Sequence, residues 1–168
     1  AAAAAAAAGR RARLFALDDP GMQARLERGP CLVHWVARVL RPKDLARWQA
    51  QYPARIAPVI PMTRGDLSWR LTVPEDGAFP GQLGAADGIV PTLIQWDTPA
   101  HPSARLPATG LALRSLKARH PRAEAVREQL DWLGAAHLIE LEDAAGGEPA
   151  LAAEIETPAG LRTLGRLE

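Results

Sequence analysis

The sequence has a single cysteine, Cys31, among its 168 residues. An internal disulfide and a zinc site built from several cysteines are therefore excluded, and a reducing cytoplasm is the expected compartment. No apolar run approaches the length of a membrane-spanning helix. The chain also has no large excess of positive or negative charge, because 20 basic residues nearly balance 19 acidic ones. The composition gives no electrostatic reason to expect a nucleic acid or an anionic membrane as a partner.

Several catalytic motifs are absent as well. The sequence contains no glycine-rich phosphate loop, no nucleophile elbow and no paired-cysteine zinc motif. What remains is the composition of an ordinary globular protein, with 48% hydrophobic and 23% charged residues, in a chain long enough for a real core. The frequent alanine, arginine and proline are typical of a bacterial genome rich in G and C.

The N-terminus is a tract of eight alanines with no starting methionine. Basic residues follow this tract instead of preceding it, which argues against a signal peptide. We interpret residues 1–10 as an alanine-rich tract or linker, unless the alanines stand for residues of another identity. We expect the chain to be the C-terminal part of a longer protein.

The stretch Cys31–Val39 predicts a buried strand. It is short, rich in β-branched and aromatic residues, and preceded by Gly29-Pro30. Period-two alternation places His34 and Arg38 on one face and only apolar residues on the other. We expect the apolar face to pack on the core and the face with His34 and Arg38 to line a cleft.

The rest of the pattern predicts one order of elements twice: a strand, a proline-started helix and three further strands. We interpret residues 31–110 as the first such unit and residues 111–168 as the second, within one structural domain. Residues 11–30 are interpreted as a remnant strand and helix of a preceding segment. The expected strands are 13–17, 31–39, 56–62, 68–73, 89–97, 111–118, 136–141, 150–156 and 161–167, and the expected helices begin at Pro20, Lys43 and Pro121.

Five segments carry a resemblance to a known superfamily. They are R-L-F-A-L-D-D-P (13–20), L-V-H-W-V-A-R (32–38), W-R-L-T-V-P-E-D-G (69–77), P-T-L-I-Q-W (91–96) and R-H-P (119–121). The chain resembles the vicinal oxygen chelate superfamily of glyoxalases, bleomycin-resistance proteins and dioxygenases, and in particular its bacterial glyoxalase-like domain proteins. The resemblance implies an α+β fold in which repeated βαβββ units form curved mixed β-sheets around a cleft. It also implies an additional N-terminal segment with its own histidine-bearing strand, which we do not find here.

The resemblance further implies a divalent metal, held by histidine and glutamate side chains, that chelates two adjacent substrate oxygens. His34 lies where the resemblance places a metal ligand. The last strand of its unit offers Gln95, where the metal-binding pattern favours glutamate. Aligning Pro42 with Pro121 puts Leu113 opposite His34, and leucine cannot bind a metal. The set of metal ligands is therefore incomplete. The alternative for His34 is that it is a cleft histidine hydrogen-bonded to a neighbour.

Two arginines and a tryptophan complete the candidate ligand site. Arg38 and Arg70 lie on the polar faces of their strands and are suited to clamp a carboxylate or phosphate. Trp96, near a strand end, is expected to wall the pocket. For both arginines the alternative is a salt bridge, with Asp66, Asp97 or Glu154 as partner. The predicted ligand-binding residues are His34, Arg38, Arg70, Gln95 and Trp96, with His34 also the candidate metal ligand.

We expect structural roles for the remaining candidate groups. His120 lies where the N-cap of a helix belongs, so its ring either caps that helix or is solvated. His101 lies in the proline-rich crossover and could border the cleft, although most loop histidines are inert. Cys31 is expected to be an inert buried thiol.

Three function classes stay open at this point. The first is an enzyme of the lyase, isomerase or dioxygenase type that transforms a small oxygenated metabolite. The second is a non-catalytic, drug-sequestering protein with an aromatic-lined apolar cleft, usually completed by a homodimer. The third is a partner-binding module with an exposed apolar patch. A fold by itself does not decide among these classes.

Overall fold

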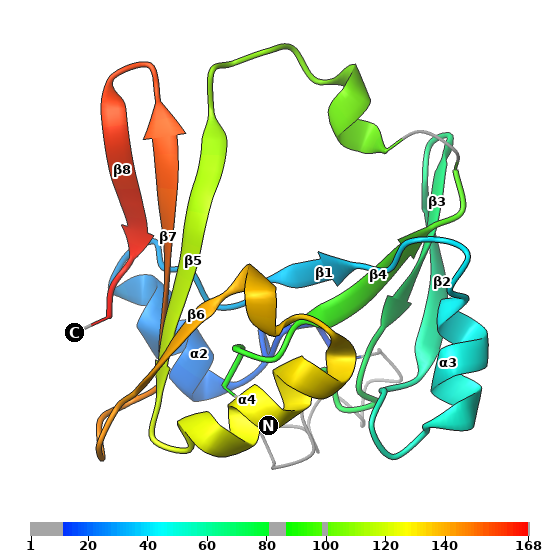
Figure 1. Cartoon of the computed structure of the whole chain (residues 1–168), viewed down its shortest axis with the longest axis horizontal. Coiled ribbons are helices and arrows are strands. Elements are labelled where there is room, and N and C mark those ends of the chain that lie inside the picture. Colours follow the sequence, from blue (N-terminus) through cyan, green and yellow to red (C-terminus); the bar gives the residue numbers. More distant parts are fainter. Residues whose placement is uncertain (1–11, 81–86, 99–100, 168) are drawn as a thin grey trace.

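The computed structural model describes residues 12–80, 87–98 and 101–167. Two four-stranded mixed sheets stand side by side, with helices packed around their lower parts (Figure 1). Sheet A contains β1 (Val36–Arg38), β2 (Val59–Arg64), β3 (Leu67–Thr72) and β4 (Thr92–Trp96). Sheet B contains β5 (Ala112–His120), β6 (Glu140–Asp143), β7 (Ala150–Thr157) and β8 (Gly160–Gly165). The helices are α2 (Pro20–Glu27), α3 (Leu45–Gln51) and α4 (Ala123–Leu133), with 3-10 turns η1 (Pro102–Arg105) and η2 (Ala136–Leu138). The expected α+β class with mixed sheets is confirmed.

The two units share the expected order of elements, βαβββ, but pair their strands differently. Sheet A has the order β1-β4-β3-β2, with β1 parallel to β4. Sheet B has the order β6-β5-β7-β8, with β5 parallel to β6. The first strand of unit one is therefore an edge strand, whereas the first strand of unit two lies inside its sheet. The internal repeat holds for the order along the chain and not for the order of strands in the sheets.

Five expected strands differ from the structure by three residues or more. Two of them only begin later, at Val59 instead of residue 56 and at Thr92 instead of residue 89. Residues 13–17 form a turn instead of a strand, because the Asp18 carboxylate accepts hydrogen bonds from both the backbone N–H and the Nε of Arg13. The strand expected over 31–39 forms only over Val36–Arg38, where β4 offers partners. Residues 136–138 form the turn η2, and the strand that follows begins at Glu140.

The helices begin and end for local reasons that the sequence shows. Asp19 caps α2 by accepting a hydrogen bond of 3.0 Å from the N–H of Met22, and proline follows at the first helical position. Asp44 caps α3 in the same way, so this helix begins at Leu45 and not at Lys43. Gly134 ends α4 with a φ of 73°, as expected for a left-handed C-cap.

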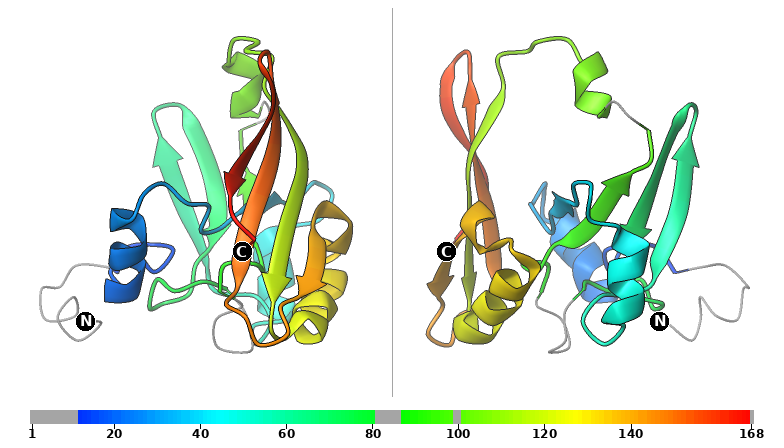
Figure 2. Two further views of the ribbon diagram at one scale, coloured as in Figure 1. Left: turned by 90° about the vertical axis from the view of Figure 1, so that its left-hand side faces the viewer. Right: turned by 45° about the vertical axis from the view of Figure 1, so that its right-hand side comes forward.

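The core lies in two clusters that meet between the sheets. One cluster packs α4 on sheet B, through Val126 and Leu130, and also takes in Ile89 from the segment that precedes β4. The other packs α3 on sheet A, through Leu45 and Leu93. The two helices lie beside the lower parts of the sheets (Figures 1 and 2), and Trp48 of α3 contacts Trp132 of α4. Among the described residues, every helix is too short or too polar to span a bilayer.

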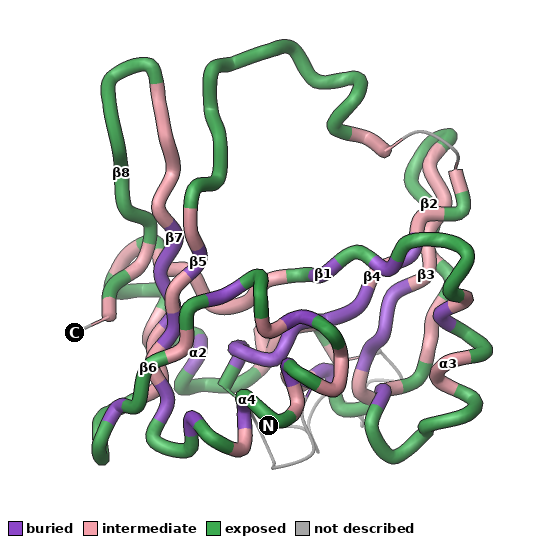
Figure 3. The backbone as a smooth tube through the Cα atoms, in the orientation of Figure 1, coloured by how far each residue is buried: buried purple, intermediate pink, exposed green. Residues whose placement is uncertain are grey.

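The upper part of sheet B is exposed, as is the crossover that runs from β4 to β5 across the top of the molecule (Figure 3). Large apolar side chains lie on these segments, with Leu106 at 70%, Leu113 at 65% and Leu161 at 53% exposure. Arg105 ties the crossover to the β2–β3 turn through an ion pair of 2.5 Å with Asp66.

Candidate functional site

One face of sheet A packs against α3, and the opposite face turns away from that helix. Ala37 and Leu93 point toward α3, as their place in the same core cluster as Leu45 shows. Residues paired in register share a face, and successive residues alternate. We call the side away from α3 the open face, and its residues are Val36, Arg38, Ile60, Met62, Arg64, Leu67, Trp69, Leu71, Thr92, Ile94 and Trp96.

Arg38 is the cation of β1 on the open face. Its side chain is exposed, and within the part of the chain that the structure describes the guanidinium forms no hydrogen bond or ion pair. Its neighbours on this face are apolar: Val36, 42% exposed, lies two residues earlier, and Ile94 is its register partner on β4. A guanidinium in this setting has its donors available and can hold a carboxylate through two parallel hydrogen bonds.

Three aromatic rings lie close together near one end of the open face. The rings of Trp69 and Trp96 lie 5.3 Å apart with an interplanar angle of 47°. The ring centroid of His101, from the crossover, lies 5.5 Å from that of Trp96, and the two ring planes are at 80° to each other. Trp69, which is not among the site residues predicted from the sequence, is half-buried on the open face. The sequence feature that could have identified Trp69 is the alternation of side chains in β3, which places Trp69 and Leu71 on one face.

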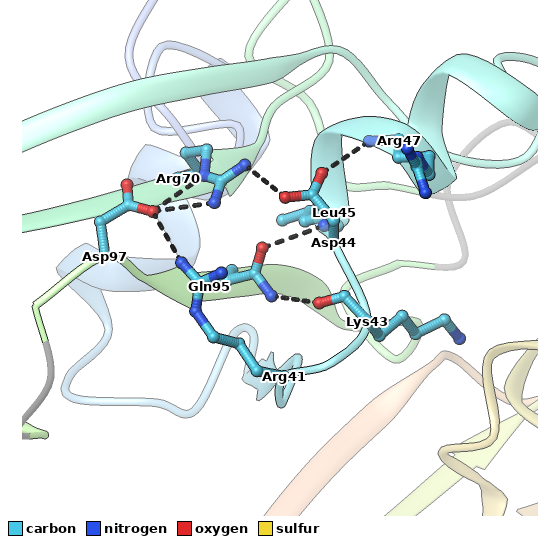
Figure 4. Close-up of polar contacts among 8 residues, drawn as sticks. All are labelled: Arg41, Lys43, Asp44, Leu45, Arg47, Arg70, Gln95 and Asp97. Carbon is cyan, nitrogen blue, oxygen red and sulfur yellow. Dashed lines mark hydrogen bonds and ion pairs between the residues drawn. The ribbon is translucent and has the colours of Figure 1, made fainter.

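The other two predicted residues of this sheet, Arg70 and Gln95, lie on the face that meets α3 (Figure 4). Nη2 of Arg70 lies 2.8 Å from the carboxylate of Asp97, and Nη1 lies 3.2 Å from that of Asp44. The hydrogen bonds to Asp97 raise the pKa of Arg70, so this guanidinium is charged and its donors are used by Asp97 and Asp44. Of the alternatives drawn from the sequence, the salt bridge is the one observed for Arg70. Arg38 and Arg70 do not converge on one ligand, because they point to opposite sides of the sheet.

Gln95 holds the start of α3 to β4 (Figure 4). Its side-chain oxygen accepts a hydrogen bond of 3.0 Å from the N–H of Leu45, and its NH2 donates one of 2.6 Å to the C=O of Lys43. The side chain is 1% exposed. The oxygen and the NH2 group of this amide therefore both form hydrogen bonds within the protein.

His34 is bonded at both ring nitrogens. Nε2 accepts a hydrogen bond of 3.1 Å from the backbone N–H of Thr92, and this places the ring proton on Nδ1, which donates to the C=O of Gly88 at 2.8 Å. The rings of Phe15 and Phe79 each lie 5.1 Å from the imidazole. Burial lowers the pKa of His34 to about 4, so the ring is neutral at pH 7. This is the hydrogen-bonded alternative that the sequence left open.

The divalent metal that the resemblance implies does not fit these side chains as they are placed. A metal on His34 would have to displace the hydrogen bond at Nδ1 or the bonds from the N–H and hydroxyl of Thr92 at Nε2, and Gln95 points to α3 with its amide already engaged. Across residues 12–80, 87–98 and 101–167, no three histidine, cysteine or acidic side chains gather in a metal-ligand geometry. We therefore derive no chemical step through a metal.

Two other features lie outside the open face. His120 is the last residue of β5 and is 1% exposed, so it is neither solvated nor the N-cap of α4; that position is Arg122, which has no side-chain cap bond. Its Nδ1 accepts a hydrogen bond from the N–H of Arg122 at 3.0 Å, and its Nε2 faces the carboxylate of Asp87 at 3.2 Å. A narrow cavity between the two units, lined by Ile56 and Trp132 among others, has a volume of about 20 Å³. That is space for about one water molecule and not for a metabolite.

Comparison with known proteins gives one family. A family model described as a glyoxalase-like domain matches residues 1–134, which include all of unit one and α4 of unit two. No curated protein and no solved structure matches the chain.

Proposed function

The chain belongs to the glyoxalase-like domain family, and from this premise we propose that it binds a small oxygenated metabolite on the open face of sheet A. The observation that carries the proposal is the placement of Arg38. Its guanidinium is exposed and unpaired among the described residues, and the nearest residues of its face are Val36, Ile94 and the tryptophan pair Trp69 and Trp96. By composition and its single cysteine, the protein is assigned to a bacterial cytoplasm.

The proposed ligand has a polar group for Arg38 and an apolar body for the rest of the face. A carboxylate meets the guanidinium through two hydrogen bonds, and adjacent oxygens of a 2-oxo acid fit the same fork. The apolar body packs on Ile94 and against Trp96, the next two side chains of β4 on this face. Most ligand sites combine an apolar lining with a few polar groups in this way.

A second candidate is sequestration of an apolar molecule without chemical change. It is favoured by the commitment of His34 and Gln95 to structural hydrogen bonds, which leaves neither as a ready acid, base or metal ligand. The two candidates differ in what Arg38 does. A metabolite with a carboxylate depends on the guanidinium, whereas an apolar molecule depends on the tryptophans alone.

The test is an NMR titration of the indole N–H signals with benzoate, an aromatic carboxylate, and with benzamide, its uncharged counterpart. We expect benzoate to shift the signals of Trp69 and Trp96, which can be assigned with single Trp→Phe variants. Arg38→Ala should weaken benzoate binding about tenfold or more, because a charge-assisted pair contributes about 1.5–3 kcal/mol. Arg38→Lys should restore part of the affinity.

Arg47→Ala is the matched control, because Arg47 is an exposed arginine on α3, away from the open face. It should leave benzoate binding unchanged. Equal binding of benzoate and benzamide, with no effect of Arg38→Ala, would reject the metabolite proposal in favour of sequestration. Shifts confined to other tryptophans would reject the open face as the site.

A further inference from the structure

We propose that the free edge of β8 pairs with β8 of a second copy of this chain, which joins two copies of sheet B into one continuous antiparallel sheet. β8 is the last strand in the order β6-β5-β7-β8, and among the described residues no strand pairs with its other side. Five of its six residues are exposed (Figure 3). The inference is independent of the ligand site, which lies on the other sheet.

β8 lacks the protection that the other sheet edges have. The edge strand β2 carries Pro61, which has no N–H to offer a partner. β1 has only three residues, and β6 is a four-residue strand with three acidic side chains. β8 contains neither proline nor an acid, and its one charged residue is Arg162. An edge strand of this kind is a template for pairing with another strand.

The hairpin defines which backbone groups of β8 are free. A two-residue turn joins Thr157 to its register partner Gly160. In such a hairpin the N–H and C=O groups of the closing pair point at each other, and the direction alternates along the strand. The N–H and C=O of Leu161 and of Thr163 therefore point away from β7, toward the free edge.

Two registers let a second β8 bond antiparallel to these groups with its side chains on the matching faces. One is centred on Arg162 and places two guanidinium groups directly opposite each other, which is unfavourable. The other is centred on Thr163, so that the two Thr163 residues exchange both backbone hydrogen bonds. This second register also sets Leu161 opposite Gly165 of the second copy, and Arg162 opposite Leu164.

The Thr163-centred register is the reason for proposing a second copy of the chain as the partner of β8. The strand is complementary to itself in this register: no like charges meet, and Leu161, 53% exposed, lies over a glycine with no side chain. Leu164, 41% exposed, is covered by the stem of Arg162. An unrelated strand would have to supply the same sequence of small and apolar residues by chance.

Sedimentation velocity of the full chain over a dilution series tests the pairing. We expect the wild type to show a concentration-dependent monomer–dimer equilibrium. In Thr163→Lys the new lysine lies beside Glu154, its register partner on β7, so the fold is kept. Two lysines then face each other across the dimer, which should raise the dissociation constant about tenfold. Thr163→Glu puts a second carboxylate beside Glu154, so its retained fold is checked by circular dichroism, and it should weaken self-association through repulsion between the two glutamates across the dimer.

Mixing the two variants gives the sharpest readout. A lysine on one copy and a glutamate on the other attract each other, so the mixture should regain dimers that neither variant forms alone. Thr63→Lys, the same change on the edge strand β2, is the matched control and should dimerise like the wild type. A wild type that stays monomeric over the whole series, or a Thr163→Lys variant that dimerises as well as the wild type, would overturn the proposal.

Discussion

The backbone N–H of Thr92 donates a hydrogen bond of 3.1 Å to Nε2 of His34, and this bond links the first residue of β4 to the segment that leads into β1. Because an N–H group can only donate, the imidazole has to be neutral at this nitrogen. The other nitrogen, Nδ1, bonds to the C=O of Gly88. His34 thus connects three segments, and its protonation state is coupled to folding.

The first prediction is a loss of stability in weak acid that depends on His34. Burial lowers the pKa of this side chain from 6.5 to about 4. The unfolded chain takes up a proton as the pH falls below about 6.5, whereas the folded chain does so only near pH 4. The contribution of His34 is therefore complete above pH 6.5 and is lost between pH 6.5 and pH 4, by up to about 3 kcal/mol. Urea unfolding at pH 7 and pH 4.5 measures it.

His34→Gln should show a smaller difference between the two pH values, since glutamine does not titrate. His137→Gln, a change at an exposed histidine, is the control and should keep the full difference. The pKa of Glu154 is lowered by hydrogen bonds from Ser115 and Lys117, so its contribution is lost only below its ordinary 4.5 and does not interfere. An unchanged difference in His34→Gln would show that another group is responsible.

The second prediction concerns Gly88, whose carbonyl accepts the hydrogen bond from His34. Its φ is +90°, and a Cβ at this position would lie 2.1 Å from the C=O oxygen of Val33. Gly88→Ala should therefore lower the free energy of unfolding by more than about 2 kcal/mol, from backbone strain and a backbone clash together. Gly146→Ala is matched, because Gly146 also has a φ of +90° but has nothing within 4 Å of the added Cβ. It should cost only about 1 kcal/mol, and equal losses in the two variants would contradict the role of the clash.

The third prediction concerns the buried amide that anchors α3. Gln95→Leu keeps the volume of the side chain but leaves the N–H of Leu45 and the C=O of Lys43 without their partner. We expect a loss of about 2–3 kcal/mol in urea unfolding, together with faster hydrogen exchange at the Leu45 amide. Gln51→Leu, at the exposed end of the same helix, is the control. Slow exchange at Leu45 in Gln95→Leu would mean that the helix start is held by other contacts.

The fourth prediction concerns the join between the two units. Trp48 of α3 stacks on Trp132 of α4, with ring centroids 5.4 Å apart and an interplanar angle of 21°. Trp132→Ala should cost about 3 kcal/mol, and Trp132→Phe less. In a double-mutant cycle with Trp48→Ala, we expect a coupling of about 0.5–1.5 kcal/mol. Strict additivity would show that the two rings contribute to stability separately.

Much of the fold followed from local patterns. Asp19 before a proline marked the start of α2, and Gly134 marked the end of α4, because a capping carboxylate and a left-handed glycine act within one turn of chain. Alternation in β1 separated buried Ala37 from exposed Val36 and Arg38. These features depend on a few neighbouring residues, which is why the sequence was sufficient to predict them.

The candidate site was predicted only in part. Arg38 and Trp96 lie on the open face, whereas Arg70 and Gln95 lie on the face of the same sheet that meets α3. Alternation states that neighbouring residues take opposite faces, but it does not state which face a helix covers. His34 was predicted as a ligand-binding or metal-binding residue, with a hydrogen-bonded histidine as the alternative. The alternation could not show its partners, because Gly88 and Thr92 lie more than fifty positions away in the chain.

The sequence by itself determined the α+β class, the order βαβββ in both units, the helix caps and the alternation of side chains, because hydrogen bonding and sterics between near neighbours set all of these. Only the tertiary structure decided that β5 lies inside its sheet while β1 lies at an edge. It also decided that, among the residues described, β8 has a free side and Arg38 is unpaired while Arg70 is not. Those outcomes depend on which strands pair and in which register. Pairing is a choice among contacts distant in sequence, and its free energy comes from the whole packed core.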